Sequence, residues 1–338
     1  MEFGHPNGFG ATVAIGFLPP AAPLYRPTPG CPSKPGNWTA TGGTSLDPCY
    51  VLYSYLHGQI PYGPVRSVAL FSAGVGEIVY SSGYVEPFGG APYLSIDTQP
   101  DQALWSWDVA RGIALCPNTY PGFGGYAYGG YEVDLYGGIH SLGYAPHVTS
   151  TNYFYQNSHD IARGIILLPN CVTGYVLDAY GKIHPFAADV VPAQEIPSTP
   201  TKTPSWSFDI ARSFDYVGPI YGVDSGYVLD GYGGVSAWGN APATSGETLW
   251  EPPAQKTTWD IARAIVADTA NGIGAGYTLD GYGGVHPFGG EPSIASSTKY
   301  WGADVARGIA MIPGSGAGNY VDTSGSVQSF TNGQQHCC

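Results

Sequence analysis

Short apolar runs separated by glycine and proline follow one another along the whole chain. The run Ala162–Leu168 is apolar apart from its arginine and ends at Pro169. A run of this length between turn residues is typical of a strand buried on both faces. A second run, Gly226–Asp230, leads into a glycine-rich turn, and a third run starts at Val235. This order predicts groups of three antiparallel strands, with a hairpin between the second and the third.

The first run repeats along the chain, usually after the motif D-I/V-A-R. Five complete copies occur at 108–111, 160–163, 209–212, 260–263 and 304–307. A degenerate copy contains Arg66, and an earlier one has Val13 at the arginine position. From Val13 through the six arginines the spacings are 53, 45, 52, 49, 51 and 44 residues. The second and third runs recur with them, so the chain contains seven units.

A unit of about 48 residues made of short strands cannot bury its faces alone, so the units must stack on one another. Sheets of three or four strands stacked radially form a β-propeller, which usually has four to eight blades. We therefore predict an all-β fold, a seven-bladed β-propeller, with six or eight blades or a β-solenoid as alternatives. The expected single domain covers residues 1–338, and residues 1–10 are a candidate ring-closing strand. The expected blades are 11–63, 64–107, 108–159, 160–208, 209–259, 260–303 and 304–338.

The order of the GIAL-type strand, the YVLD-type strand and the VHPFG-type strand resembles the blade layout of NHL and YWTD-type propellers. It also resembles the glycine- and aromatic-rich repeats of bacterial surface proteins. The likeness covers residues 11–331, although the YWTD tetrapeptide is absent. Members of those families bind proteins, glycans or RNA, and some propellers are enzymes, so the resemblance implies a fold rather than one function.

Composition agrees with a packed, helix-poor protein and narrows the list of partners. There are 50 Gly and 30 Pro among 338 residues, whereas 14% of the chain is aromatic and 11% is charged. Disordered chains show the opposite balance of aromatic and charged residues. The net charge of −13 disfavours nucleic acid and anionic lipid as partners. No apolar run reaches the 18 residues of a membrane-spanning helix. Residues 11–18 match the first strand of a unit, so we expect no recognisable signal peptide.

The six repeat arginines are the first candidate binding residues. They are Arg66, Arg111, Arg163, Arg212, Arg263 and Arg307. If their strands line the central channel, they form a ring that could bind a carboxylate or a sulfate, because arginine offers two parallel donors. The alternative is that each arginine pairs with an aspartate of its own or the next blade. We favour ion pairing, because arginine and aspartate occur together in the repeat.

Tyrosines in the hairpin turns are the second candidate. Tyr136, Tyr180, Tyr232 and Tyr282 recur at one position of the repeat. If exposed, their rings would suit stacking against sugars at several equivalent sites. Packing between the blades is the alternative.

The sequence contains no pattern typical of a catalytic or metal centre. His140, His184 and His286 share one repeat position, but equivalent residues of different blades diverge, whereas zinc ligands lie about 2 Å from one point. Off-pattern acids such as Glu132 and Asp215 are expected in scattered loops. No nucleophile elbow, phosphate-binding loop or HExxH motif occurs. We therefore expect no catalytic residue, no metal and no cofactor, and an enzyme acting on polysaccharides is a third option.

Six cysteines suggest disulfide bonds and an oxidising environment. Cys31 and Cys49 flank an insertion in the first unit, and Cys116 and Cys171 follow the first strands of neighbouring units. Cys337 and Cys338 have no obvious partners. We expect a non-catalytic propeller displayed extracellularly or on a virion or cell surface, where it binds protein neighbours or glycans. A component of a larger assembly, such as a virion or filament, is the alternative.

Overall fold

The computed structural model describes residues 62–94, 105, 107–116, 128–149, 160–244, 259–269, 274–294, 298–312 and 315–331. These residues form six three-stranded antiparallel sheets, each made of three consecutive strands. The sheets are sheet 1 (β1, Val65–Ser72; β2, Val75–Tyr80; β3, Val85–Phe88), sheet 2 (β4, Ala110–Leu115; β5, Gly129–Asp134; β6, Ile139–Gly143), sheet 3 (β7, Ala162–Leu167; β8, Thr173–Asp178; β9, Ile183–Ala187), sheet 4 (β10, Ala211–Ile220; β11, Val223–Asp230; β12, Val235–Trp238), sheet 5 (β13, Ala262–Ala267; β14, Gly276–Asp280; β15, Val285–Phe288) and sheet 6 (β16, Ala306–Met311; β17, Ala317–Asp322; β18, Val327–Thr331).

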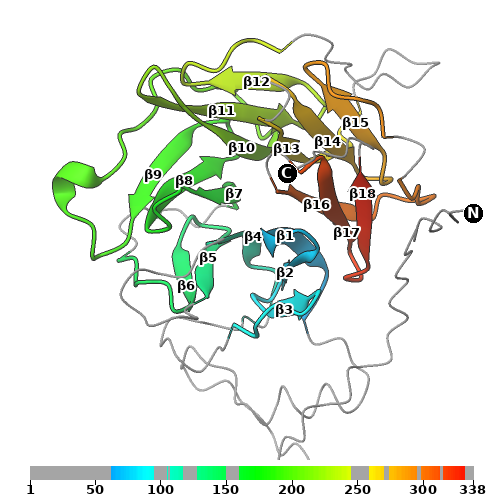
Figure 1. Cartoon of the computed structure of the whole chain (residues 1–338), viewed down its shortest axis with the longest axis horizontal. Coiled ribbons are helices and arrows are strands. Elements are labelled where there is room, and N and C mark those ends of the chain that lie inside the picture. Colours follow the sequence, from blue (N-terminus) through cyan, green and yellow to red (C-terminus); the bar gives the residue numbers. More distant parts are fainter. Residues whose placement is uncertain are drawn as a thin grey trace, which may run out of the picture.

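The six sheets form a closed ring with the first strand of each sheet nearest the centre (Figure 1). At the closure between sheets 6 and 1, the Val65 N–H donates to the Thr323 carbonyl at 3.1 Å. Between sheets 1 and 2, the Ala110 N–H makes the equivalent bond to the Ser81 carbonyl at 3.0 Å. A β-propeller is therefore confirmed. Seven blades are not, because residues 1–61, which include most of the predicted first blade 11–63 and the predicted ring-closing strand 1–10, lie outside the described residues.

The core lies between neighbouring sheets, with one buried cluster at each of the six interfaces. At four interfaces, a fully buried tyrosine from the middle strand meets an aromatic ring of the next sheet edge to face. The pairs are Tyr131–Phe186, Tyr175–Trp238, Tyr227–Phe288 and Tyr277–Phe330, with ring centroids 5.6–5.8 Å apart. This geometry is favourable beyond the apolar area that it buries, so each sheet depends on its neighbour.

The inner strands approach one another closely because the residue after each repeat arginine is small. A Cβ on Gly112 would lie 3.2 Å from the Cα of Gly164 in the next sheet, and one on Gly308 would lie 3.0 Å from the backbone nitrogen of Val68. The equivalent residues elsewhere are Ser67, Ser213 and Ala264. The narrow centre of the ring therefore depends on these small side chains.

Helical structure in the described part of the chain is limited to a short 3-10 turn (η2, Ala193–Glu195), and no helix there is long and apolar enough to cross a membrane.

Candidate functional site

Each inner strand contains a β-bulge at its arginine. In sheet 2, Ala110 pairs with Asp134 and Gly112 pairs with Val133, so that Arg111 has no partner across the ladder. The same irregularity occurs at the five other repeat arginines. A bulge leaves one residue unpaired and redirects its side chain. All six arginines therefore lie near the start of the inner strands, on one face of the disc, which we call the arginine face.

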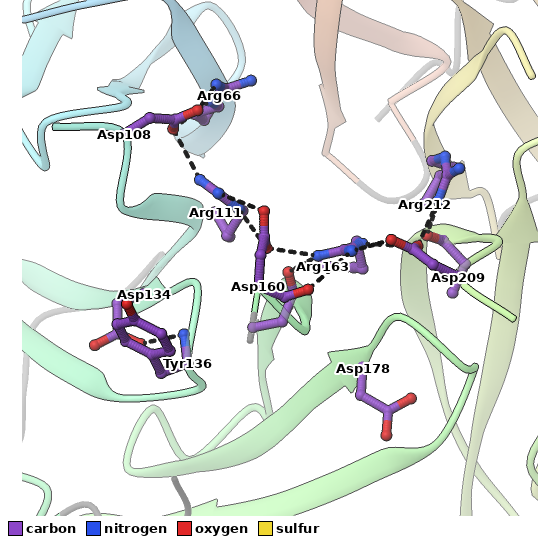
Figure 2. Close-up of polar contacts among 12 residues, drawn as sticks. Arg66, Asp108, Arg111, Asp134, Tyr136, Asp160, Arg163, Asp178, Asp209 and Arg212 are labelled. Atoms are coloured by element: carbon purple, nitrogen blue, oxygen red, sulfur yellow. Dashed lines mark hydrogen bonds and ion pairs between the residues drawn. The ribbon is translucent and has the colours of Figure 1, made fainter. Parts of the chain in front are cut away.

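Asp108, Asp160, Asp209, Asp260 and Asp304 alternate with these arginines in an arginine–aspartate chain around the centre. In sheet 2, Nε and Nη2 of Arg111 donate to Oδ1 and Oδ2 of Asp160, in sheet 3, at 3.0 and 2.7 Å. Nη1 of Arg111 donates to Oδ1 of its own Asp108 at 2.8 Å. The other links between sheets are Arg66–Asp108, Arg163–Asp209, Arg212–Asp260 and Arg263–Asp304. Figure 2 shows the part of the arginine–aspartate chain between Arg66 and Arg212.

These contacts favour the charged form of the three aspartates Asp160, Asp260 and Asp304. Burial alone would raise the pKa of the Asp160 carboxyl, but hydrogen bonds and positive charge from Arg111 and Arg163 bring the pKa below its ordinary value. The pKa values of Asp260 and Asp304 are lowered in the same way, because the contacts with arginine outweigh the effect of burial. Ion pairing is thus the observed role of the repeat arginines, as we favoured, and ligand binding by the ring stays a prediction.

The arginine–aspartate chain is interrupted where sheet 6 meets sheet 1. There Gly63 occupies the position that an aspartate has in the other described repeats. Nη1 of Arg307 donates to Oδ1 of Asp304 at 2.9 Å, and Nη2 donates to the Asp304 carbonyl at 3.1 Å. Among the described residues, no carboxylate accepts from Nε of Arg307. Six arginines therefore share five aspartates.

The four turn tyrosines also lie on the arginine face, since each hairpin turn is beside the start of its inner strand in the ladder. Each tyrosine N–H donates to the turn aspartate, as from Tyr136 to Asp134 at 2.8 Å. The Tyr282 ring stacks with Trp259 at 6.2 Å and with Tyr300 at 5.8 Å. All four tyrosine side chains are half-buried. Part of each aromatic ring packs against the protein and part is accessible to solvent, so glycan binding stays a prediction.

Exposed aromatic residues lie beside these tyrosines, and they are not among the candidate binding residues that we named from the sequence. Trp107, Phe208 and Trp259 are 54%, 50% and 49% exposed, and Tyr300 is 70% exposed. The first three directly precede an aspartate of the arginine–aspartate chain. Their place directly before the repeat aspartate was the signal available in the sequence. These aspartates lie half-exposed on the arginine face, and the residue before each of them lies at the same surface. We call Trp107, Phe208, Trp259 and Tyr300 the aromatic rim.

The three repeat histidines each contact the turn aspartate of their own sheet. Nε2 of His140, His184 and His286 lies 3.1, 3.0 and 2.8 Å from Oδ2 of Asp134, Asp178 and Asp280. Within the ranges that the structure describes, no cluster of three or more His, Cys, Asp or Glu side chains could hold a metal ion.

Four off-pattern acids that we expected in loops lie in strands instead, among them Glu86 in β3 and Asp224 in β11. Glu132 is in β5, and Asp215 is in β10, where it accepts the N–H of Ala267 in sheet 5 at 2.8 Å. Burial raises the pKa of Asp215 to about 6. Alternation of apolar and polar residues did not identify Glu132 and Asp215, because both side chains are directed into an interface between sheets.

Cys116 and Cys171 form a disulfide with a Cα–Cα distance of 5.4 Å. It joins sheets 2 and 3 at the ends of their inner strands, on the face opposite the arginine face. Cys31, Cys49, Cys337 and Cys338 lie outside the described residues.

Comparisons with known proteins identify no family. No protein-family model matches the chain, and no curated protein matches it, so the resemblance to NHL and YWTD-type propellers is not confirmed. A solved structure titled "YCF48 bound to D1 peptide" aligns with 80% of this chain and 94% of its own, at 10% identity and a TM-score of 0.41. At that score the likeness carries no functional argument, and the assignment to the propeller fold rests on the ring of six sheets.

Proposed function

We propose that this chain is a single propeller domain of six blades that acts without catalysis as a binding and structural module. The six described sheets close on one another through equivalent hydrogen bonds, which supports this blade number. Among the described residues, the acids on the arginine face are engaged with arginine, histidine, hydroxyl or backbone N–H groups. These carboxylates are acceptors in ion pairs and turns, which supports a structural role for them.

The observation that carries the binding role is the aromatic rim on the arginine face. Trp259, Tyr282 and Tyr300 form a continuous stack, and its outer members are 49% and 70% exposed. Large exposed aromatic side chains are enriched where proteins bind partners, because one ring provides much apolar area at little entropic cost. Sugar rings use the same surfaces. The ligand of the rim is therefore a protein surface or a surface glycan.

An extracellular, virion-surface or cell-surface setting agrees with the disulfide between sheets 2 and 3, since such bonds persist in oxidising environments. The module would present the arginine face to its partner. In a larger assembly the partner would be a protein neighbour.

Two measurements test this proposal. A glycan array and native mass spectrometry of the full chain ask whether it binds sugars or associates with protein copies. The variant Trp259→Ala should reduce whichever binding is found at least tenfold. Tyr221→Ala is the matched control, because Tyr221 is 96% exposed at the β10–β11 turn, on the opposite face. Equal binding by both variants, or hydrolysis of a polysaccharide by the wild type, would contradict the proposal.

A further inference from the structure

The interruption of the arginine–aspartate chain leaves a gap of defined chemistry. In each complete link, one aspartate bridges two arginines. Asp160 accepts from Nε and Nη2 of Arg111 and from Nη1 of Arg163. Between sheets 6 and 1 the bridging carboxylate would have to come from position 63, and Gly63 has none.

The two arginines beside the gap retain the geometry of the others. Arg307 keeps its bonds to Asp304 and to the Ala306 carbonyl, which fix the guanidinium as in the other sheets. Its Nε–Nη2 edge, which elsewhere holds the next aspartate, has no carboxylate partner in the described ranges. Arg66 keeps its pair with Asp108 but lacks the aspartate of its own sheet. The Arg307 side chain is 21% exposed and that of Arg66 is 26% exposed, so solvent reaches both.

The backbone explains why this position lacks a carboxylate of its own. Gly63 has a φ of +70°, and a Cβ there would lie 2.2 Å from Oγ of Ser81. An aspartate would be strained and would clash with that hydroxyl. The local backbone therefore disfavours a carboxylate at position 63, and the missing group would have to come from another segment or molecule.

We propose that the closure between sheets 6 and 1 is a binding site for a carboxylate on a peptide, held by Arg307 and Arg66. The Nε and Nη2 groups of Arg307 would donate to its two oxygens, as arginine does in bidentate pairs. Arg66 would donate through Nη1, as Arg163 does to Asp160. The ligand is an aspartate or glutamate side chain or a chain terminus. This inference deepens the proposed binding role by naming the chemistry recognised beside the aromatic rim.

The experiment is a titration of the full chain at low salt, followed by the Nε–Hε NMR signals of its arginines. The probes are the capped peptide Gly-Gly-Asp-Gly-Gly and its Asn counterpart. We expect the Asp peptide to shift the signals of Arg307 and Arg66 and the Asn peptide to leave them unchanged. Arg307→Lys keeps the charge but loses the paired donors, so it should weaken binding at least tenfold.

Lys182→Gln is the control, because it removes a positive charge from an exposed side chain on the same face and should bind as the wild type does. Unshifted arginine signals, equal effects of both peptides, or unchanged affinity in Arg307→Lys would overturn the inference. The titration of the wild type stands even if a variant fails to fold. A negative result here together with intact binding at Trp259 would remove this site and leave the proposed function.

Discussion

The interfaces between sheets 4 and 5 and between sheets 1 and 2 occupy equivalent positions but have different chemistry. At the first, Tyr227 is fully buried against Phe288 and donates its hydroxyl to the Pro242 carbonyl at 3.0 Å. At the second, the tyrosine position holds Glu77 and the aromatic position holds Leu142. Glu77 is fully buried, and neither of its carboxylate oxygens has a hydrogen-bond partner in the described structure.

We call the interface between sheets 1 and 2 the weak interface, because a buried carboxyl without a partner among the described residues lies there at the position where four other interfaces have a paired tyrosine. Burial and the neighbouring charge of Glu86 raise the pKa of Glu77 to about 9. On the facing side, burial also raises the pKa of Glu132, with a further contribution from Asp134. A buried carboxyl without a partner costs free energy. The closed ring can accommodate this free-energy cost, because each sheet packs against two neighbouring sheets.

The largest effect is expected from removing a ring at a strong interface. Tyr227→Ala should lower the free energy of unfolding by about 3–5 kcal/mol, because it deletes a buried aromatic side chain and leaves a cavity. Denaturant unfolding measures the loss. Tyr227→Phe removes only the hydroxyl and should cost about 1 kcal/mol. Glu77→Ala, at the equivalent position, should cost far less than Tyr227→Ala, and equal losses would contradict the contrast between the interfaces.

The next largest effect concerns the interface between sheets 2 and 3, which has the described disulfide. Replacing Cys116 and Cys171 together by serine should destabilise the chain by about 2–4 kcal/mol, because the bond closes a long loop. Thermal melts with and without reductant provide the measurement. Reductant should lower the melting temperature of the wild type by more than that of the double variant, and an equal response would contradict a stabilising bond.

A smaller, pH-dependent effect is expected at the weak interface. The pKa of Glu77 rises from 4.5 to about 9 on folding, so the folded state binds its proton more tightly. Stability should therefore fall as pH rises from about 4.5 to about 9. Glu77→Gln removes this loss and should stabilise the chain at pH 8 by about 1–3 kcal/mol, with little change at pH 4.

Chemical denaturation of the wild type and of Glu77→Gln at pH 4 and pH 8 measures this difference in stability. Glu195→Gln, in the exposed turn η2, is the matched control and should follow the wild type. A pH profile of Glu77→Gln parallel to that of the wild type would show that Glu77 does not titrate between these limits.

The smallest effect is expected from one link of the arginine–aspartate chain. Arg212→Lys loses the bidentate contact with Asp260 and should cost about 1 kcal/mol, since the aspartate is half-exposed. The lowered pKa values of Asp160, Asp260 and Asp304 mean that the stabilisation is present above about pH 4 and is lost as pH falls further. Added salt should reduce the difference between variant and wild type, and a salt-independent difference would argue against an ionic origin.

The repeat, the three strands of each unit and the pairing of arginine with aspartate could be predicted from the sequence. Each depends on residues close together in the chain or on a motif that recurs at a regular spacing. The roles of Glu77 and Glu132 could not be predicted, because period-2 alternation does not tell which neighbouring sheet a side chain meets. The number of blades could not be predicted from the sequence either. The unit with Val13 resembles the others, and whether it takes a place in the ring depends on contacts between residues far apart in the chain.

The sequence by itself determined that this chain forms short strands that must be stacked, because each unit has too little apolar surface to be stable alone. Only the tertiary structure decided where the ring closes. At that closure sheet 6 meets sheet 1, and Gly63 lies where every other described link has an aspartate. The physical reason is that an ion pair between neighbouring sheets joins residues about 50 positions apart, and the identity of the last neighbour is fixed by geometry alone.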